Sequence, residues 1–260
     1  GGGGKAAGGG ARDALGQTMR NAPMAALDYE RLKDTIFNHA QEAPLVLQAL
    51  RWRLTKSARR QRKAALSQYI ANDLLSASVL AVLVDADAPP QLREEALRLV
   101  TLFASEASGR SYLLAKPDLV VSLCKLLTLE NADSTARQNA LGTLQKLSLR
   151  RQPQNTMIDA DIIAWLARML SEVDSLSQYS VEYGTALLMN RSLRTAGKGK
   201  CAEPDIAILD VLSQLMESDS LQVRTYVNGT LYSILVRAPL KEKAREIGRP
   251  ESLEALIEHS

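Results

Sequence analysis

Two markers recur along this chain of 260 residues with a common period. The first marker is an apolar doublet near the end of a helical segment, and the doublets lie 43, 43, 46 and 41 residues apart: Leu83-Val84, Leu126-Leu127, Met169-Leu170, Leu215-Met216 and Leu256-Ile257. The second marker is a small or short apolar anchor, and these anchors lie 44, 44 and 43 residues apart: Ala96, Ala140, Gly184 and Val227. Two independent markers with one period of about 43 residues indicate an internal repeat.

The length of the repeat predicts the fold. Each anchor is followed four residues later by a larger apolar residue, so that both lie on one helix face that must be buried: Val100, Leu144, Leu188 and Leu231. A period of ~40 to 47 residues is typical of HEAT and armadillo units. The links "SGRSYLLAKPD" and "RRQPQNTMIDAD" favour the armadillo plan, in which a short first helix precedes two longer ones. We therefore expect an all-α, right-handed armadillo-type solenoid of about five stacked units.

The repeats do not cover the whole chain. Residues 1–26 are rich in Gly and Ala and have little apolar surface, which predicts a flexible lead-in. We expect the armadillo-repeat domain to span residues 27–260, with a shorter first unit (helices near 44–54 and 57–71) and an incomplete last unit.

The composition argues against catalysis and against a metal centre. The chain has two His and two Cys, at positions 39, 259, 124 and 201, whereas a zinc site needs about four such ligands at set spacings. Isolated cysteines are typical of a reduced, intracellular protein, and no apolar run reaches the ~18 residues of a membrane span. We expect a binding protein with no cofactor, no metal, no catalytic residue and no membrane segment.

The stretch "NRSLRTAGKGK" at residues 190–200 contains two Gly-Lys pairs that suggest a phosphate loop. A P-loop requires Gly five positions before its second Gly and a hydroxyl residue after its Lys. Arg194 and Cys201 occupy these positions, and a helix rather than a strand precedes them. We instead interpret Gly197 as the residue that ends a helix after Leu193, with an exit loop beyond it.

Several segments of the chain resemble a known family. They are "LDYERLKDTIF", "LQALRWRLT", "YIANDLL", "NALGTLQKLSLRR", "YGTALLMNRSLRTAGK" and "YVNGTLYSIL", in matching order from about Leu27 onward. They resemble the armadillo domain of the LisH-containing ciliary family called armadillo-repeat-containing protein nine. The LisH segment and coiled coil of that family do not precede the repeats here, and Arg191 stands where the family and the internal repeat have Leu.

The resemblance implies a cellular role. Family members are non-enzymatic scaffolds of the cytoplasm and cytoskeleton, located at the basal body, the centriole and the ciliary tip. They work with TOG-domain and other tip proteins to set axonemal microtubule stability and ciliary length, and they support ciliary signalling. We therefore expect such protein partners here, together with direct or indirect association with microtubules.

In armadillo proteins the third helix of each unit lines a binding groove. Nuclear-import receptors place Trp, and Asn four residues later, on this helix, whereas the equivalent pairs here are Arg98/Leu102, Gly142/Lys146, Ala186/Asn190 and Gly229/Ser233. The missing Trp residues argue against the main alternative, a cargo or nuclear-transport adaptor that binds basic or helical peptides. The groove positions that we predict to contact protein are Arg98, Lys146, Asn190, Arg191 and Ser233.

Two features of this groove leave alternatives open. The small residues Gly142, Ala186 and Gly229 could admit a partner's backbone, or they could let adjacent third helices pack, which we favour. Arg191 occupies a repeat position held elsewhere by an apolar residue. Either its stem packs while its charged head reaches solvent, or an acidic partner meets it.

Residues 51–63, "RWRLTKSARRQRK", hold seven basic residues and no acidic one. These residues, here called the basic patch, are Arg51, Arg53, Lys56, Arg59, Arg60, Arg62 and Lys63. The patch could bind acidic tubulin tails or an acidic partner, or it could be a solvated helical corner whose Trp52, Leu54 and Ala58 belong in part to the core. The net charge of +3 and the lack of a stacking aromatic surface argue against nucleic acid.

Overall fold

The computed structural model describes residues 25–83, 85, 87–116, 118–129 and 133–246. Throughout these ranges the regular structure is helical, which confirms the predicted all-α class. The chain divides into two compact units, Gly1–Val82 and Leu83–Ser260, and each is considered by itself below. Most of the predicted lead-in and the predicted doublet Leu256-Ile257 lie outside the described residues.

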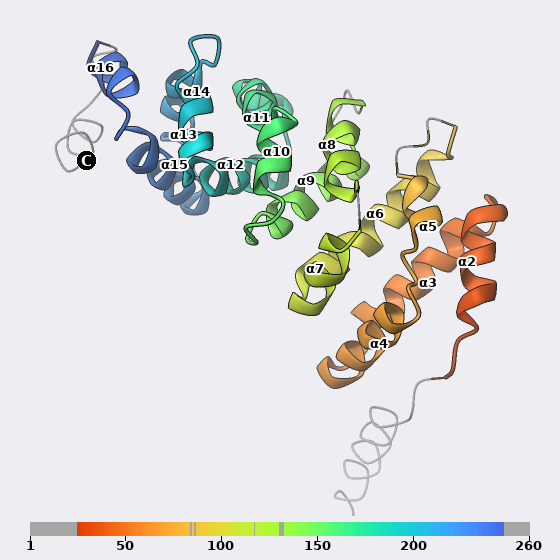
Figure 1. The fold of residues 1–260 in the computed structure, drawn as a ribbon. Helices are drawn as coiled ribbons and strands as arrows, with labels where there is room; N and C mark the ends of the chain where they lie inside the picture. Colours follow the sequence, from red (N-terminus) through yellow and green to blue (C-terminus); the bar gives the residue numbers. More distant parts are fainter. Residues whose placement is uncertain (1–24, 84, 86, 117, 130–132, 247–260) are drawn as a thin grey trace, which may run out of the picture. The chain divides into compact units, whose positions relative to one another are not determined.

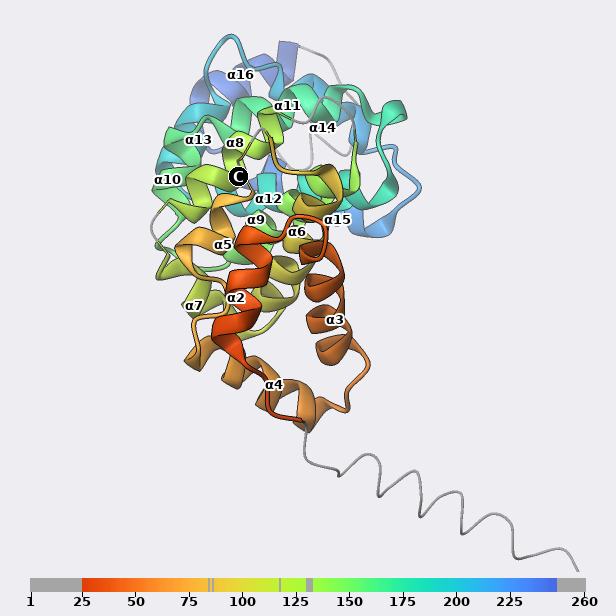
Figure 2. The same ribbon diagram turned by 90° about the vertical axis from the view of Figure 1, so that its right-hand side faces the viewer.

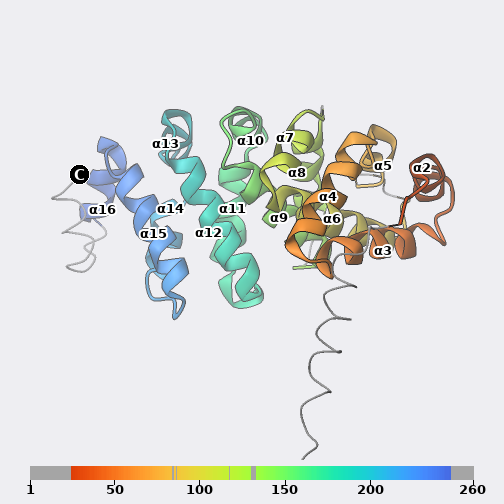
Figure 3. The same ribbon diagram turned by 90° about the horizontal axis from the view of Figure 1, so that it is seen from below.

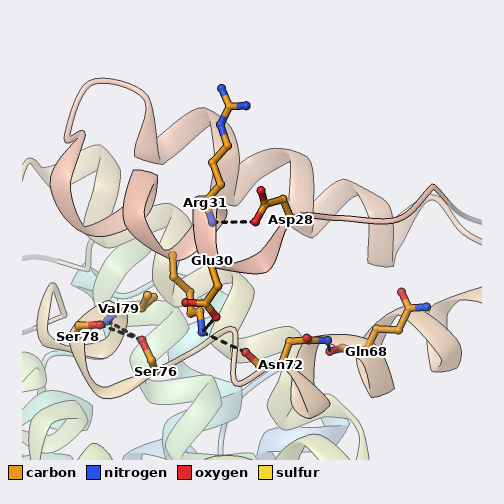
Figure 4. Close-up of polar contacts among 9 residues, drawn as sticks. Asp28, Glu30, Arg31, Gln68, Asn72, Ser76, Ser78 and Val79 are labelled. Atoms are coloured by element: carbon orange, nitrogen blue, oxygen red, sulfur yellow. Dashed lines mark hydrogen bonds and ion pairs between the residues drawn. The ribbon is translucent and has the colours of Figure 1, made fainter.

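The described part of the first unit, residues 25–82, contains the helices α2 (Tyr29–Asn38), α3 (Ala43–Thr55), α4 (Arg59–Ala71) and α5 (Ala77–Ala81). Local signals fix where two of them begin, because the side chains of Asp28 and Ser76 accept hydrogen bonds from the backbone N–H groups of Arg31 and Val79 (Figure 4). The predicted helices near 44–54 and 57–71 are confirmed as α3 and α4.

The core of the first unit joins α3 to α4. Tyr69 is fully buried, and its hydroxyl donates a hydrogen bond to the carbonyl of Leu50 at 3.2 Å. Burial raises the pKa of the Tyr69 hydroxyl, so it remains a donor at all physiological pH values. The edge of the Tyr29 ring packs on Tyr69, which brings α2 onto the same core.

The second unit repeats a three-helix pattern. The first helices are α7 (Ala107–Leu114), α10 (Gln154–Asp159), α13 (Thr195–Cys201) and α16 (Ala238–Glu246). The second helices are α8 (Leu119–Leu129), α11 (Ile162–Ser171) and α14 (Ile208–Leu215). The third helices are α6 (Pro90–Ser105), α9 (Thr135–Leu147), α12 (Gln178–Ser192) and α15 (Leu221–Ile234), and a 3-10 turn at Val173–Ser175 precedes α12.

Within the second unit these helices form layers. The third helices pack on one another in chain order, α6 on α9, α9 on α12 and α12 on α15 (Figures 1 and 3). The second helices lie behind them, and the first helices α10 and α13 contact each other along one edge of the unit (Figure 2). This three-helix stacking confirms the armadillo-type solenoid.

The predicted repeat anchors hold these layers together. Ala96, Ala140, Gly184 and Val227 are all buried, and the four larger residues that follow them are fully buried at 0% exposure. Three of the third helices, α9, α12 and α15, also begin alike, because Ser134, Ser177 and Ser220 each accept a hydrogen bond from the backbone N–H three residues ahead. The sequence period therefore sets the core contacts of all four helices and the starting points of these three.

The Gly-Lys stretch forms a helix, so the predicted exit loop is wrong. α12 ends at Ser192, and residues 195–201 form α13, the first helix of the next unit. Gly197 lies inside α13, where a Cβ atom would come within 2.0 Å of the Arg191 carbonyl oxygen. Gly109 occupies the equivalent place in α7, where a Cβ atom would lie 2.0 Å from the carbonyl oxygen of Phe103. Glycine is needed at both sites because a first helix crosses the end of a third helix at backbone contact.

Candidate protein-interaction surfaces

The middle of the third-helix row is occupied by aromatic side chains of α12. The rings of Tyr179 and Tyr183 stack with centroids 4.1 Å apart, and the Lys146 ammonium of α9 lies 5.3 Å from the centre of the Tyr183 ring. Burial lowers the pKa of Lys146, and the nearby Arg110 lowers it further. Lys146, one of the predicted groove residues, is therefore a half-buried cation held over an aromatic ring.

The small residues of the row let neighbouring third helices pack. A Cβ atom on Gly142 would lie 2.1 Å from the Tyr179 hydroxyl oxygen, and one on Gly229 would lie 2.8 Å from the Met189 sulfur. These contacts join α9 to α12 and α12 to α15, and Ala186 is also buried. The favoured interpretation, packing between adjacent helices, is confirmed for the two glycines.

Arg98 of α6 is neutralised within its own helix. Its guanidinium forms ion pairs with Glu94 at 2.5 Å and with Glu95 at 2.9 Å. The Arg98 side chain is about one third exposed and Glu95 is buried. A partner that used Arg98 would have to compete with two carboxylates that are already in place.

The other three predicted groove residues join the ends of successive third helices. Asn190 donates a hydrogen bond to the Ser148 hydroxyl at 2.8 Å, and Arg191 donates one to the Ser148 carbonyl at 3.0 Å. One unit further along, the Ser233 hydroxyl donates to the Ser192 carbonyl at 2.7 Å. Because Arg191 and Ser233 are buried, they are structural links and present no surface to a partner.

Both predicted roles of Arg191 are therefore wrong. Its side chain is fully buried at 0% exposure, so the charged head does not reach solvent and no partner can meet it in this state. Nε and Nη1 make no hydrogen bond, and none of the described residues forms an ion pair with it. Burial lowers the pKa of Arg191 to about 10, with a further contribution from Arg194, so that the buried guanidinium is still charged at neutral pH.

The basic patch spans the end of α3 and the start of α4 in the first unit. Arg53 donates a hydrogen bond to the Ala25 carbonyl at 2.7 Å, and Arg62 donates one to the Leu54 carbonyl at 3.0 Å, so these two have structural roles. The Lys56 ammonium lies 4.4 Å from the centre of the Trp52 ring, which is 43% exposed. Leu54 is buried as predicted, whereas Ala58 is exposed. Arg51 is half-buried.

The remaining patch residues, Arg59, Arg60 and Lys63, are exposed in the first turns of α4. The N-terminal end of a helix carries partial positive charge and favours acidic side chains. The first turn of α4 has no acidic residue, so the basic side chains oppose the helix dipole there. This arrangement costs stability, and the described residues give these three side chains no internal hydrogen bond or ion pair, so the binding role of the patch stays a prediction.

The cysteines and carboxylates give no sign of a chemical site. Cys124 and Cys201 are both buried, and burial raises the pKa of each thiol to about 12, so neither is an activated thiolate. Among the residues that the structure describes, His, Cys, Asp and Glu do not gather into a group that could hold a metal ion. Across the same ranges, no helix is both long and apolar enough to cross a bilayer.

Solved structures of similar fold are armadillo-repeat proteins. A designed armadillo repeat protein has a TM-score of 0.67 with 16% identity, covering 89% of this chain and 97% of its own. A computationally designed armadillo protein for modular peptide recognition has a TM-score of 0.57 with 17% identity, covering 82% and 97%. At these identities the similarity concerns the fold alone, and it agrees with the three-helix repeats above. This chain is an armadillo-repeat protein.

Sequence comparison narrows the relationship. Residues 157–260 match the family described as LisH domain-containing protein ARMC9, ARM repeats. The chain is 43% identical over 234 residues to LisH domain-containing protein ARMC9 of Xenopus laevis, covering 88% of this chain and 29% of that protein. It is 41% identical over 248 residues to the Homo sapiens protein of the same name, covering 92% and 30%. The resemblance to the ARMC9 armadillo repeats is confirmed, and the chain spans about a third of the length of these relatives.

Tyr179 and Tyr183 were not predicted from the sequence as surface residues. They lie five residues and one residue before the anchor Gly184, on the same helix as the examined pair Ala186/Asn190. The positions that carry Trp and Asn in import receptors do not include these tyrosines. Their spacing of four residues, which places two aromatic rings one helical turn apart on one helix face, is the sequence signal that could have found them.

Proposed function

We propose that this chain is the armadillo part of a non-catalytic scaffold at the ciliary basal body and ciliary tip. In this role it binds TOG-domain and other tip proteins and so controls axonemal microtubule stability, ciliary length and ciliary signalling. The observation that carries the proposal is the 41 to 43% identity to ARMC9 proteins along most of the chain. The chain spans about a third of those relatives, so the proposal concerns the share of the function that the repeats perform.

The arrangement of side chains supports a binding role. The described residues form no metal-ligating cluster, and both thiols are buried with raised pKa values. The stacked third helices, in contrast, present half-buried Lys146, Tyr179 and Tyr183 on a rigid row. Rigid rows of this kind are what repeat proteins use to bind other proteins.

The basic start of α4 is the part of the chain that we propose meets microtubules or an acidic tip protein. Arg59, Arg60 and Lys63 are exposed, and tubulin tails are acidic, so a charge-complementary contact would form there. Arg62 and Arg53 have internal hydrogen bonds and are left out of the test.

The test of the patch replaces Arg59, Arg60 and Lys63 with Glu. We expect the variant to lose most of its co-sedimentation with microtubules or its capture of a purified TOG-domain protein. We also expect a gain of about 0.5 to 1 kcal/mol in the free energy of unfolding, because acidic residues suit the helix start. The matched control, K125E/R168E, changes two exposed basic residues of the second unit that lie outside the patch, and it should leave both binding assays unchanged. Unchanged binding by the α4 variant would remove the patch from the proposal.

The cellular proposal is tested by imaging the tagged full-length protein that contains these repeats in ciliated cells. We expect signal at the basal body and the ciliary tip, and shortened or unstable cilia when the repeats are deleted. Accumulation in the nucleus without ciliary signal would favour the transport-adaptor alternative instead.

A further inference from the structure

A row of exposed apolar side chains follows the ends of the third helices. Leu149, Leu193 and Val236 are 60%, 57% and 52% exposed. Each lies nine residues after the repeat anchor of its unit, at Ala140, Gly184 and Val227. Single exposed apolar residues are common on protein surfaces, but the same repeat position in three successive units is a regular feature of the fold.

A basic residue follows each of these apolar residues: Arg150, Arg194 and Arg237. We call these six residues the junction ridge, because they lie where a third helix meets the first helix of the next unit. The three junction segments, 148–153, 192–200 and 235–241, together contain seven basic residues and no acidic one. Lys200 is paired with Asp161 at 3.0 Å and Glu203 at 2.6 Å, while Arg150 and Arg194 are exposed.

Hydrogen bonds place the three junctions next to one another. Asn190 and Arg191, which directly precede the second junction, donate hydrogen bonds to Ser148 of the first. Ser233 bonds to the Ser192 carbonyl, and Arg237 donates to the Thr195 carbonyl at 3.2 Å. Successive junctions are therefore neighbours in the structure, and the buried Arg191 is one of the residues that join them.

We propose that the junction ridge is a docking surface for an acidic amphipathic segment of a partner protein. Leu, Ile or Phe side chains of the segment would cover Leu149, Leu193 and Val236, while its Asp and Glu residues would pair with the arginines. A second copy of this chain fits less well, because a symmetric contact would bring this basic surface against itself. The inference rests on the proposed function, since it names the surface by which the scaffold would hold a partner.

The test uses a defined probe, a labelled 20-residue helical peptide with Leu on one face and Glu on the other. A twin peptide with Lys in place of Glu is the charge control. We expect the chain to bind the Glu peptide and not the Lys peptide, with affinity that falls as salt rises. The variant L149S/L193S/V236S should weaken binding at least about tenfold, and R150E/R194E should do the same.

A matched variant separates the ridge from exposed leucines in general. Leu129 and Leu221 are 64% and 71% exposed and lie outside the junctions, so L129S/L221S should bind the Glu peptide like the unaltered chain. All these side chains are exposed, and circular dichroism should report the same helical content for every variant. Equal binding by the ridge variant and this control, or equal binding of the two peptides, overturns the proposal.

The remaining outcomes are also decisive. If the chain self-associates in analytical ultracentrifugation and L149S/L193S/V236S abolishes that association, the ridge is a contact between copies and the proposal is wrong. If the chain does not bind the Glu peptide but the full-length protein still localises to the basal body and ciliary tip, the docking proposal alone is refuted. A nuclear location with ridge-dependent peptide binding would refute the ciliary function and leave the ridge in place.

Discussion

At the scale of single residues, Arg191 is the position where the prediction from the sequence and the observed structure differ most. Its repeat equivalents, Phe103, Leu147 and Ile234, are fully buried apolar residues. The alignment of the repeats thus correctly indicates that this position lies in the core. The positive charge of Arg191 led to the wrong prediction that its guanidinium contacts solvent or a partner protein. The guanidinium instead lies at the end of α9, where its Nη2 atom bonds to the Ser148 carbonyl. A cation is favourable at a helix C-terminus, which offsets part of the cost of its burial.

We predict that Arg191→Leu raises the free energy of unfolding by about 1 to 3 kcal/mol. The substitution restores the apolar residue of the other repeats and removes a buried charge in which two nitrogen atoms, Nε and Nη1, make no hydrogen bond. Urea denaturation followed by circular dichroism measures the change. Arg194→Leu, at an exposed neighbouring arginine, is the control and should shift stability by less than about 0.5 kcal/mol. A destabilised R191L variant would mean that the bond to Ser148 outweighs the cost of burying the charge.

The two thiols provide a second test at this scale. Cys124 and Cys201 are buried and their pKa values are raised to about 12, so thiolate is scarce at pH 8. We expect neither thiol to react with a thiol-specific reagent within minutes in the folded protein, and both to react in denaturant. Rapid labelling of Cys201 in the native state would show that α13 opens readily.

At the scale of elements, the α12–α13 corner shows what a linear pattern cannot reveal. The end of a helical period was visible at Leu193, and α12 does end at Ser192. The pattern "TAGKGK" has two glycines and no apolar periodicity, so it gave no sign of a helix. α13 forms because it packs on α11 and α15, and because Gly197 permits backbone contact with Arg191. Such contacts between distant backbones have no signature in residue spacing.

We predict opposite effects for two glycines of α13. Gly197→Ala should lower the free energy of unfolding by about 1 to 3 kcal/mol, because its Cβ would lie 2.0 Å from the Arg191 carbonyl oxygen. Gly199→Ala should be neutral or stabilising by up to ~1 kcal/mol, because its Cβ would lie 3.5 Å from the flexible Arg237 guanidinium and Ala favours helix. Thermal or urea unfolding of the two variants checks this. Equal effects would mean that the close crossing is absent in solution.

At the scale of the whole molecule, the repeat period predicted the stacking of the second unit and the family resemblance predicted the relatives. The anchors can be recognised in the sequence because each repeat must bury the same apolar stripe of its third helix against its neighbours. This requirement imposes one residue pattern on every repeat. The division after Val82 was not predicted, although the first doublet, Leu83-Val84, and the first anchor, Ala96, both lie after it. Of the predicted groove residues, the structure leaves Arg98, Lys146 and Asn190 partly exposed, and it buries Arg191 and Ser233.

The central claim is that these repeats serve as a ciliary protein-binding scaffold. The most direct measurement is proximity labelling of the tagged full-length protein in ciliated cells, compared with the same protein lacking the repeats. The account predicts that basal-body and axonemal tip proteins, including a TOG-domain protein, are labelled and that their labelling depends on the repeats. Recovery of nuclear-import factors without axonemal tip proteins would contradict it.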